Sequence, residues 1–157
     1  MIVVGINDEV DGPIAQLVEE GNVAQQIYQF ETAIRKFREG IALVPEPKRS
    51  YPAYAYLLAG VGDNYMNLRD WEAAEIAFAE AVTAPAGEEN AYIRMGHGQA
   101  LYELNQIIEA IQELGTAYII DKTVFEGEDP KYLELIRPLI KKYDFDNWES
   151  HQGKGFH

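Results

Sequence analysis

The sequence predicts an all-α protein, a right-handed α-solenoid of three antiparallel helix pairs followed by a C-terminal capping helix. The first observation behind this prediction is a run between residues 58 and 85 that places small and large residues at helical spacing. These residues are Gly62, Tyr65, Ala74, Phe78 and Ala81. Two closely packed helices need glycine or alanine where their backbones approach, and larger side chains fill the space on either side. One such pair cannot bury its own apolar face, so we expect it to stack on others.

The second observation is that the same spacing recurs before and after this run. In each second helix a small residue is followed by a large one four places later and a small one three places after that. These residues are Ala33, Phe37 and Gly40 upstream, and Ala110, Leu114 and Ala117 downstream. The small residue of the first helix recurs as Gly21 and Gly98. Three repeats are therefore predicted at about 14–45, 55–86 and 91–122.

The central run resembles the tetratricopeptide repeat, whose pattern is W-x2-L-G-x2-Y, then A-x3-F, then P. Leu58 takes the place of the tryptophan, Val61 that of the leucine, and Pro85 closes the run. The resemblance implies the antiparallel helix pairs that the spacing also predicts.

Length and composition predict one soluble domain, residues 1–143, followed by a flexible tail at 144–157. The chain has 157 residues, of which 47% are hydrophobic and 25% charged, as expected of a globular protein with a core. Its net charge is −13, and the acidic excess is spread along the chain. That charge fits either a solvated surface or a surface suited to a basic partner. Nucleic-acid binding is not expected, because no basic stripe could neutralise phosphates.

Location is indicated only by what the sequence lacks. There is no cysteine, which excludes disulfides and thiolate metal sites. The opening Met1–Ile6 is too short and lacks the basic start of a secretory signal. No run approaches the roughly 20 apolar residues of a membrane span. We therefore expect a cytoplasmic protein with no membrane partner.

The first pair is predicted to begin at Asp11-Gly12-Pro13, with Pro13 in the first turn, and its first helix to reach about residue 27. Its second helix is predicted over residues 30–43, where apolar residues recur at spacings of three and four. Pro45 and Pro47 end it, and residues 46–54 form a spacer that a minimal array would not need.

The second pair is predicted from about Pro52, with Asp70 as the N-cap of a helix over residues 71–82. Residues 86–90 are predicted as a loop, with Asn90 capping the next helix.

The third pair is predicted at residues 91–104 and 107–120. Phe125 is expected to anchor the link to a capping helix over about 129–143. The inward residues of that helix are expected to be Leu133, Ile136, Leu139 and Ile140. Pro138 is expected to kink or break it.

No catalytic residue, metal site or cofactor is predicted. His97, between Gly96 and Gly98, is expected to face the packed interface, and these glycines form no phosphate loop because they lie within a helix. Glu109 and Glu113 are an i, i+4 pair more typical of a solvated face than of a catalytic pair.

The resemblance implies a concave groove lined by the first helix of each repeat. In the first repeat the residues at these positions are uncharged and not aromatic: Ala15, Val18, Asn22, Gln25 and Gln26. The second and third offer aromatic, thioether, acidic and amide side chains, which suit a protein partner. The predicted partner-binding residues are Tyr56, Asp63, Met66, Asn67, Tyr92, Met95, Gln99, Tyr102 and Glu103, with Ala59 beside them. The alternative is that the capping helix or a terminal segment fills this groove.

Residues 17–135 also resemble a narrower group of small bacterial tetratricopeptide proteins. The shared blocks are Leu43–Lys48, Gly62-Asp63-x-Tyr65, Arg94–Gln99 with Tyr102–Leu104, and Phe125-x-x-Glu128-Asp129-Pro130-Lys131-Tyr132. This sequence departs from the pattern of that group at Tyr51-Pro52 and at Asn90–Tyr92.

Proteins of that group are commonly encoded beside polymorphic or contact-dependent toxins. The resemblance therefore implies an immunity protein that neutralises a toxin domain with a basic surface. The alternatives are a secretion chaperone, against which the spacer counts, and a generic scaffold that binds an effector peptide.

Overall fold

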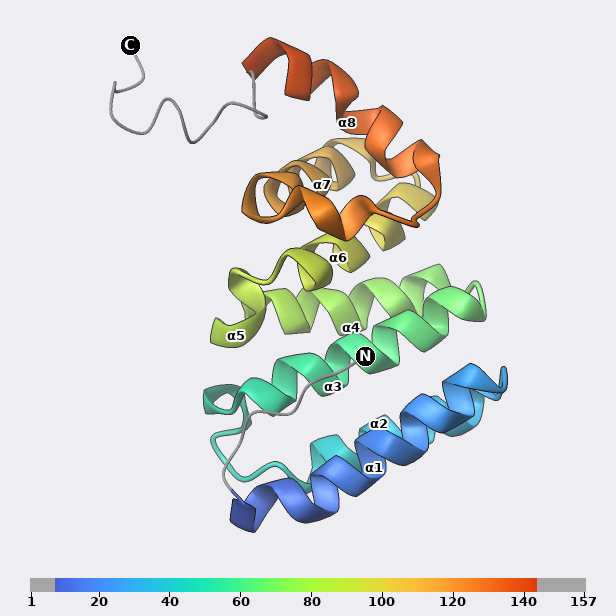
Figure 1. Ribbon diagram of the computed structural model, residues 1–157, viewed down its shortest axis with the longest axis vertical. Helices are drawn as coiled ribbons and strands as arrows, with labels where there is room; N and C mark the ends of the chain where they lie inside the picture. The colour runs from blue at the N-terminus through green and yellow to red at the C-terminus, as the bar shows by residue number, and fades with distance from the viewer. Residues whose placement is uncertain (1–7, 144–157) are drawn as a thin grey trace.

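The computed structural model describes residues 8–143, which form helices and their connections and contain no strand in that range (Figure 1). The predicted tail at 144–157 lies outside the described residues. The helices are α1 Asp8–Gln26, α2 Phe30–Leu43, α3 Pro52–Asn67, α4 Trp71–Thr83, α5 Pro85–Glu88, α6 Ala91–Glu103, α7 Ile107–Ile120 and α8 Pro130–Tyr143, with short 3-10 turns at Lys48–Ser50 and Lys122–Phe125.

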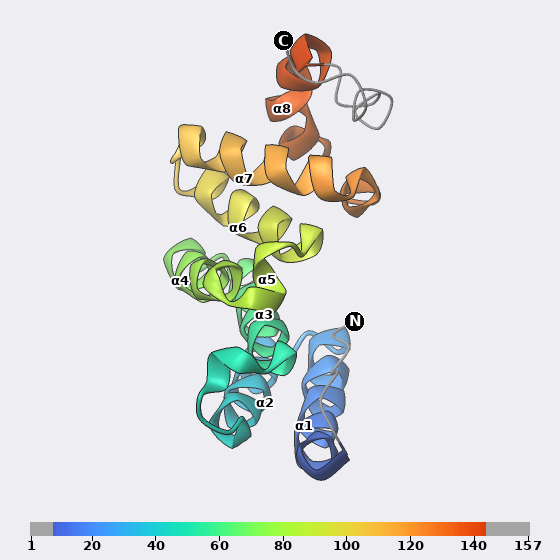
Figure 2. The same ribbon diagram turned by 90° about the vertical axis from the view of Figure 1, so that its left-hand side faces the viewer.

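The helices stack in pairs along one axis, α1 with α2, α3 with α4 and α6 with α7, and α8 lies beyond α7 at the C-terminal end (Figures 1 and 2). This arrangement confirms the predicted all-α solenoid. The division into one domain and a tail stays a prediction.

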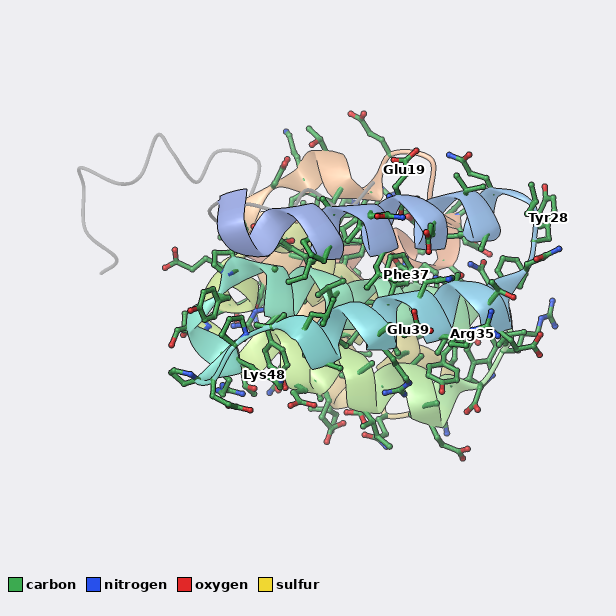
Figure 3. The ribbon with its side chains drawn as sticks, turned by 90° about the horizontal axis from the view of Figure 1, so that it is seen from below. Glu19, Tyr28, Arg35, Phe37, Glu39 and Lys48 are labelled. Atoms are coloured by element: carbon green, nitrogen blue, oxygen red, sulfur yellow. The ribbon has the colours of Figure 1, made fainter. Side chains whose placement is uncertain are left out.

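A large side chain lies against a helical glycine inside every pair. A Cβ added at Gly21 would stand 2.7 Å from the ring of Phe37, which lies between α1 and α2 (Figure 3). The same test gives 2.7 Å at Gly62 to Phe78 and 2.6 Å at Gly98 to Leu114. Real Cβ atoms do not approach so closely, so glycine allows each pair its short separation.

Phe78 also joins two pairs. Its ring is fully buried and stands 2.4 Å from the Cβ that Gly96 would carry on α6. Between the first two pairs, Leu57 packs against Gly40 in the same manner, at 3.0 Å. The core is therefore continuous from α1 to α6, and Phe78 links α3, α4 and α6.

The turn inside each pair repeats one backbone geometry without glycine. Tyr28, Arg69 and Asn105 have φ values of 62°, 59° and 62°. In each turn the following N–H donates to the carbonyl five residues earlier, at 2.9–3.0 Å. This bond pairs a carbonyl that the helix end would otherwise leave unpaired.

Helix capping agrees with the sequence at two positions. The Asp70 carboxylate accepts from the Ala73 N–H at 3.2 Å, and the Asn90 amide oxygen accepts from the Ile93 N–H at 3.0 Å. Both predicted N-caps are confirmed.

The spacer after α2 has a structural role. Lys48 Nζ donates to the carbonyls of Ile41 and Val44, at 3.0 and 2.7 Å, and so pairs the C-terminal end of α2. Arg49 reaches the end of α4, where its guanidinium donates to the Thr83 hydroxyl at 3.1 Å.

Two local predictions were wrong, and a third was wrong in one of its two alternatives. Helix α1 begins at Asp8, so Pro13 lies inside it, where a proline near the N-terminal end costs one backbone bond. The predicted loop after Pro85 starts with the turn α5, because proline suits a first helical position. Its Gly87 is required, since a Cβ there would lie 1.8 Å from the Ala81 carbonyl oxygen. The predicted break at Pro138 does not occur, because helix α8 continues to Tyr143, whereas the predicted kink there stays a prediction.

The capping helix closes the stack over a second apolar cluster. Its contributors from α8 are Tyr132 and fully buried Ile136, with Leu133 and Ile140 partly buried against the same cluster. Phe125 is buried there and is the anchor that the sequence predicted. Leu139 is half-buried and lies outside this cluster.

No helix within residues 8–143 combines the length and the apolar character that crossing a membrane requires.

Gly62→Ala is expected to lower the free energy of unfolding by about 1–3 kcal/mol, because the new methyl group would collide with the fully buried ring of Phe78. The control is Gly115→Ala in α7, where a Cβ would meet nothing within 4 Å. There, helix propensity should raise the free energy of unfolding by roughly 0.5–1 kcal/mol. Urea titration of both variants checks this; equal effects would contradict the packing described.

Ile136→Ala is expected to lower the free energy of unfolding by about 2–5 kcal/mol, because it opens a cavity under the cap. Ile108→Ala is the matched control, since Ile108 is 73% exposed on α7. Loss of stability in the control but not at Ile136 would show that α8 does not close the stack.

Candidate binding groove

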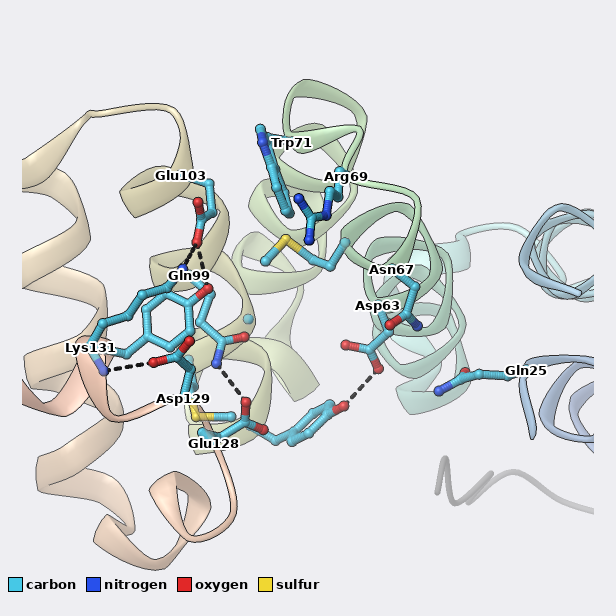
Figure 4. A pocket seen from close by; sticks show the side chains of 15 residues that line it. Gln25, Asp63, Asn67, Arg69, Trp71, Gln99, Glu103, Glu128, Asp129 and Lys131 are labelled. Atoms are coloured by element: carbon cyan, nitrogen blue, oxygen red, sulfur yellow. Dashed lines mark hydrogen bonds and ion pairs between the residues drawn. The ribbon is translucent and has the colours of Figure 1, made fainter. Parts of the chain in front are cut away.

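A hollow of about 450 Å³ opens between α3 and α6, at the side where the segment after α7 and the start of α8 fold over (Figure 4). Its lining residues from α3 and α6 are Asp63, Met66, Asn67, Tyr92, Met95, Gly96, Gln99 and Glu103. The other lining residues are Gln25, Arg69, Trp71, Glu128, Asp129, Lys131 and Tyr132. We call this hollow the groove.

Most of the predicted partner-binding residues line the groove. Those that do are Asp63, Met66, Asn67, Tyr92, Met95, Gln99 and Glu103. Tyr56 and Tyr102 do not, because their rings pack partly buried against the two apolar clusters. Met95 is only 1% exposed, so it forms part of the floor rather than an accessible contact. That these residues bind a partner remains a prediction.

Hydrogen bonds across the groove tie its walls together. The Tyr92 hydroxyl on α6 donates to Asp63 Oδ2 on α3 at 2.7 Å, and Gln99 Nε2 donates to Glu128 Oε2 at 3.0 Å (Figure 4). Under the N-terminal wall, buried Asn64 donates to Gln25 on α1 at 3.1 Å. The floor is therefore held in one arrangement by contacts from several elements.

The C-terminal wall is an ion pair set among aromatic rings. Lys131 Nζ lies 2.6 Å from Glu103 Oε1, which also accepts from the Tyr132 hydroxyl at 2.8 Å. The ammonium lies 5.5 and 5.1 Å from the ring centres of Tyr102 and Tyr132. The bond to Glu103 raises the pKa of Lys131. The positive charge of Lys131 is thus already balanced by the Glu103 carboxylate.

The lining is acidic. Asp63, Glu103, Glu128 and Asp129 contribute four carboxylates, against the cations of Arg69 and Lys131, of which Lys131 is paired. Such a lining repels an acidic ligand and favours a basic one.

Burial raises the pKa of Asp63 to about 7, although the bond from Tyr92 lowers it in part. Burial of the Tyr92 hydroxyl also raises its pKa, and the negative charge of Asp63 raises it further. Asp63 therefore changes its charge near neutral pH.

A second polar cluster lies away from the groove, where α4, α6 and α7 meet. His97 lies between Glu75, at 3.1 Å, and Glu113, at 3.3 Å, and Arg94 lies 3.0 Å from Glu113. Burial lowers the pKa of His97, but hydrogen bonds and charges from the two carboxylates outweigh it and raise the pKa overall. His97 faces a packed interface, as predicted.

Glu113 corrects the prediction of a solvated pair with Glu109. Its side chain is 17% exposed and is held by Arg94 and His97 from α6, whereas Glu109 is exposed. No group of three histidine, cysteine or acidic side chains within residues 8–143 could hold a metal ion.

Several lining residues were not predicted because they do not belong to the counted positions of a repeat. Arg69 lies in the turn between α3 and α4, Trp71 starts α4, and residues 128–132 follow the last repeat. The only signal for the last group was their inclusion in a block of the family resemblance.

No protein-family model matches the chain, and a search of curated proteins finds no match. Among solved structures, the chain is similar to the first TPR of Spaghetti (RPAP3), determined bound to the HSP90 peptide SRMEEVD. The TM-score is 0.64 at 16% sequence identity, over 90% of this chain and 99% of that one. At this identity the likeness shows the fold, which is TPR-like.

Asp63→Asn is expected to stabilise the protein above neutral pH. A folded-state pKa near 7 lies above the ordinary 3.8, so the native state keeps a proton that the unfolded state releases, and stability falls as pH rises from about 4 to 7. Asparagine removes this loss and can still accept from Tyr92. We expect a gain of roughly 1–3 kcal/mol at pH 8, reduced from the full shift because the carboxylate borders an open hollow.

The measurement is urea unfolding of both proteins at pH 4 and pH 8. The gain should shrink at pH 4, where the unfolded-state carboxyl takes up its proton. A gain of the same size at both pH values would contradict the raised pKa.

Proposed function

We propose that this protein is a non-enzymatic protein-interaction module whose groove binds a basic segment of a protein partner. The observation that carries the proposal is the groove itself, an open hollow lined by four carboxylates and two cations, of which Lys131 is paired with Glu103. Its hydrogen-bonded floor supports binding without large rearrangement, because pre-organised sites lose less entropy on association.

The structural neighbour supports a protein ligand for this fold. Its peptide, however, has the opposite charge to the basic segment that we propose. The peptide bound to that neighbour, SRMEEVD, carries three acidic side chains and one basic one. The groove of this chain would repel such a peptide. The shared fold and the different lining favour a module of the same kind with a basic partner.

The finer proposal is an immunity protein that binds and neutralises a bacterial toxin domain with a basic surface, in the cytoplasm. It rests on the resemblance to small tetratricopeptide proteins encoded beside toxins and on the net charge of −13. An acidic inhibitor gains association rate against a basic target through complementary potentials.

The second candidate is a secretion chaperone or scaffold that holds an extended effector peptide. The observation that favours it is the peptide bound by the structural neighbour. The spacer, whose Lys48 pairs the end of α2, is a feature that chaperone arrays lack and counts against this candidate.

The test is co-expression of this protein with the product of the adjacent gene, with toxicity and 1:1 complex formation as readouts. An immunity protein suppresses toxicity and forms the complex. Binding of a secreted effector without any toxicity to suppress would favour the chaperone, and no binding in either assay would overturn the proposal.

Tyr92→Ala tests the binding face. Tyr92 is 45% exposed at the mouth of the groove, and a rigid aromatic of this kind is a typical anchor. We expect its removal to weaken the complex by about 2 kcal/mol, mainly through faster dissociation.

Tyr28→Ala is the matched control, because Tyr28 is 81% exposed on the turn after α1. Surface plasmon resonance of both variants gives the rates. Equal effects, or an effect at Tyr28 alone, would place the interface elsewhere.

A further inference from the structure

We propose that the floor of the groove is a subsite for one arginine side chain of the partner, bound by the carboxylates of Asp63 and Glu128 and the amide oxygen of Gln99. This inference rests on the proposed function and names the chemical group that the groove selects.

Gln99 supplies the observation that points to a ligand. The residue is only 9% exposed, and its Nε2 donates to Glu128 Oε2 at 3.0 Å, which fixes the orientation of the amide. The amide oxygen consequently points into the hollow, on the side of Asp63 (Figure 4). Within residues 8–143 no protein donor reaches that oxygen. The oxygen is open to the solvent of the hollow, so a donor from a ligand can take the place of water there.

The two carboxylates present further acceptors to the same space. Tyr92 occupies Asp63 Oδ2, which leaves Oδ1 available, and Gln99 occupies Glu128 Oε2, which leaves Oε1. Figure 4 shows Asp63 across the hollow from Gln99 and Glu128. Three oxygen acceptors from α3, α6 and the segment before α8 therefore surround one space, and the ligand must be a donor.

The charge and geometry restrict which donor fits. An anion is excluded by the carboxylates, and no metal-binding group of three suitable side chains exists among the described residues. The chain's own cations do not complete the site. Lys131 is engaged by Glu103 at 2.6 Å, and Arg69 is exposed on the turn before α4 without a bond to Asp63 or Glu128.

Arginine suits the arrangement better than lysine. A guanidinium has five N–H donors in a fixed plane and no acceptor, so it can serve acceptors on opposite walls at once. An ammonium is more strongly hydrated and offers a single donor centre. The three acceptors lie on separate elements of the groove, so the guanidinium, whose donors are spread over a wider plane, can reach them better than an ammonium can.

The test uses blocked pentapeptides, acetyl-Gly-Ala-Arg-Ala-Gly-amide and its lysine and citrulline counterparts, titrated into the full chain at pH 8. Citrulline keeps the shape of arginine but removes its charge. Backbone and side-chain amide NMR signals report binding. We expect saturable shifts at Gln99 and Tyr92 with the arginine peptide, weaker binding of the lysine peptide, and at least tenfold weaker binding of the citrulline peptide.

Three variants locate the subsite. Asp63→Asn and Glu128→Gln each remove one charge from it, whereas Glu109→Gln removes one charge from an exposed site on α7. The first two should weaken the arginine peptide at least tenfold and the third should leave it unchanged. Unchanged amide spectra confirm that each variant is folded.

Equal binding of arginine and citrulline peptides, equal effects of all three variants, or no saturable shift would overturn the subsite. These outcomes are separate from failure of the proposed function. If the partner from the adjacent gene binds in a Tyr92-dependent manner while the peptides fail, the groove binds its partner by other contacts. If neither binds, the proposed function fails as well.

Discussion

The close approach of two helices at a glycine is the constraint on which the rest of the structure depends. In each pair a large buried side chain occupies the position opposite a glycine that has no room for a methyl group. Phe78 does this twice, against Gly62 on α3 and Gly96 on α6, and it thereby sets how α3 and α6 stand relative to each other. Asp63 and Tyr92 lie on those same two helices, one residue beyond Gly62 and four before Gly96. Their 2.7 Å hydrogen bond across the groove is a consequence of the core packing.

Helix α6 shows how one short sequence serves three environments. Gly96 and Gly98 admit neighbouring side chains, Tyr92 and Gln99 face the groove, and His97 meets carboxylates of α4 and α7 on the other side. A helix used on all its faces has little freedom to tilt or slide. The groove side chains of α6 are therefore held by a rigid element, which is what a pre-organised binding surface requires.

Much of the fold could be predicted from the sequence because its determinants are local and periodic. The spacing of glycines and aromatic residues predicted the helix pairs. The side chains of Asp70 and Asn90, which are of the kind that caps helices, predicted where two helices begin. The turns at Tyr28 and Arg69 could not be predicted, since neither residue favours a positive φ on its own. There the pairing of helix-end carbonyls decides the conformation.

The groove could be predicted only in part. Counting positions along a helix identified Asp63 and Gln99, and both line the hollow. It could not distinguish a side chain that reaches the hollow from one that packs beside it, as Tyr102 does against Tyr132. It also could not place Glu128, because that residue lies outside every repeat and reaches the groove through the fold of the whole chain.

The central claim is that the groove between α3 and α6 is the surface that meets the partner. Amide hydrogen exchange of the protein, alone and in complex with the product of the adjacent gene, tests this most directly. The account predicts that the complex slows exchange in the C-terminal half of α3, in α6 and in residues 125–132, and leaves α2 and α7 unchanged. Slowed exchange on α2 and α7, with the groove unchanged, would contradict it.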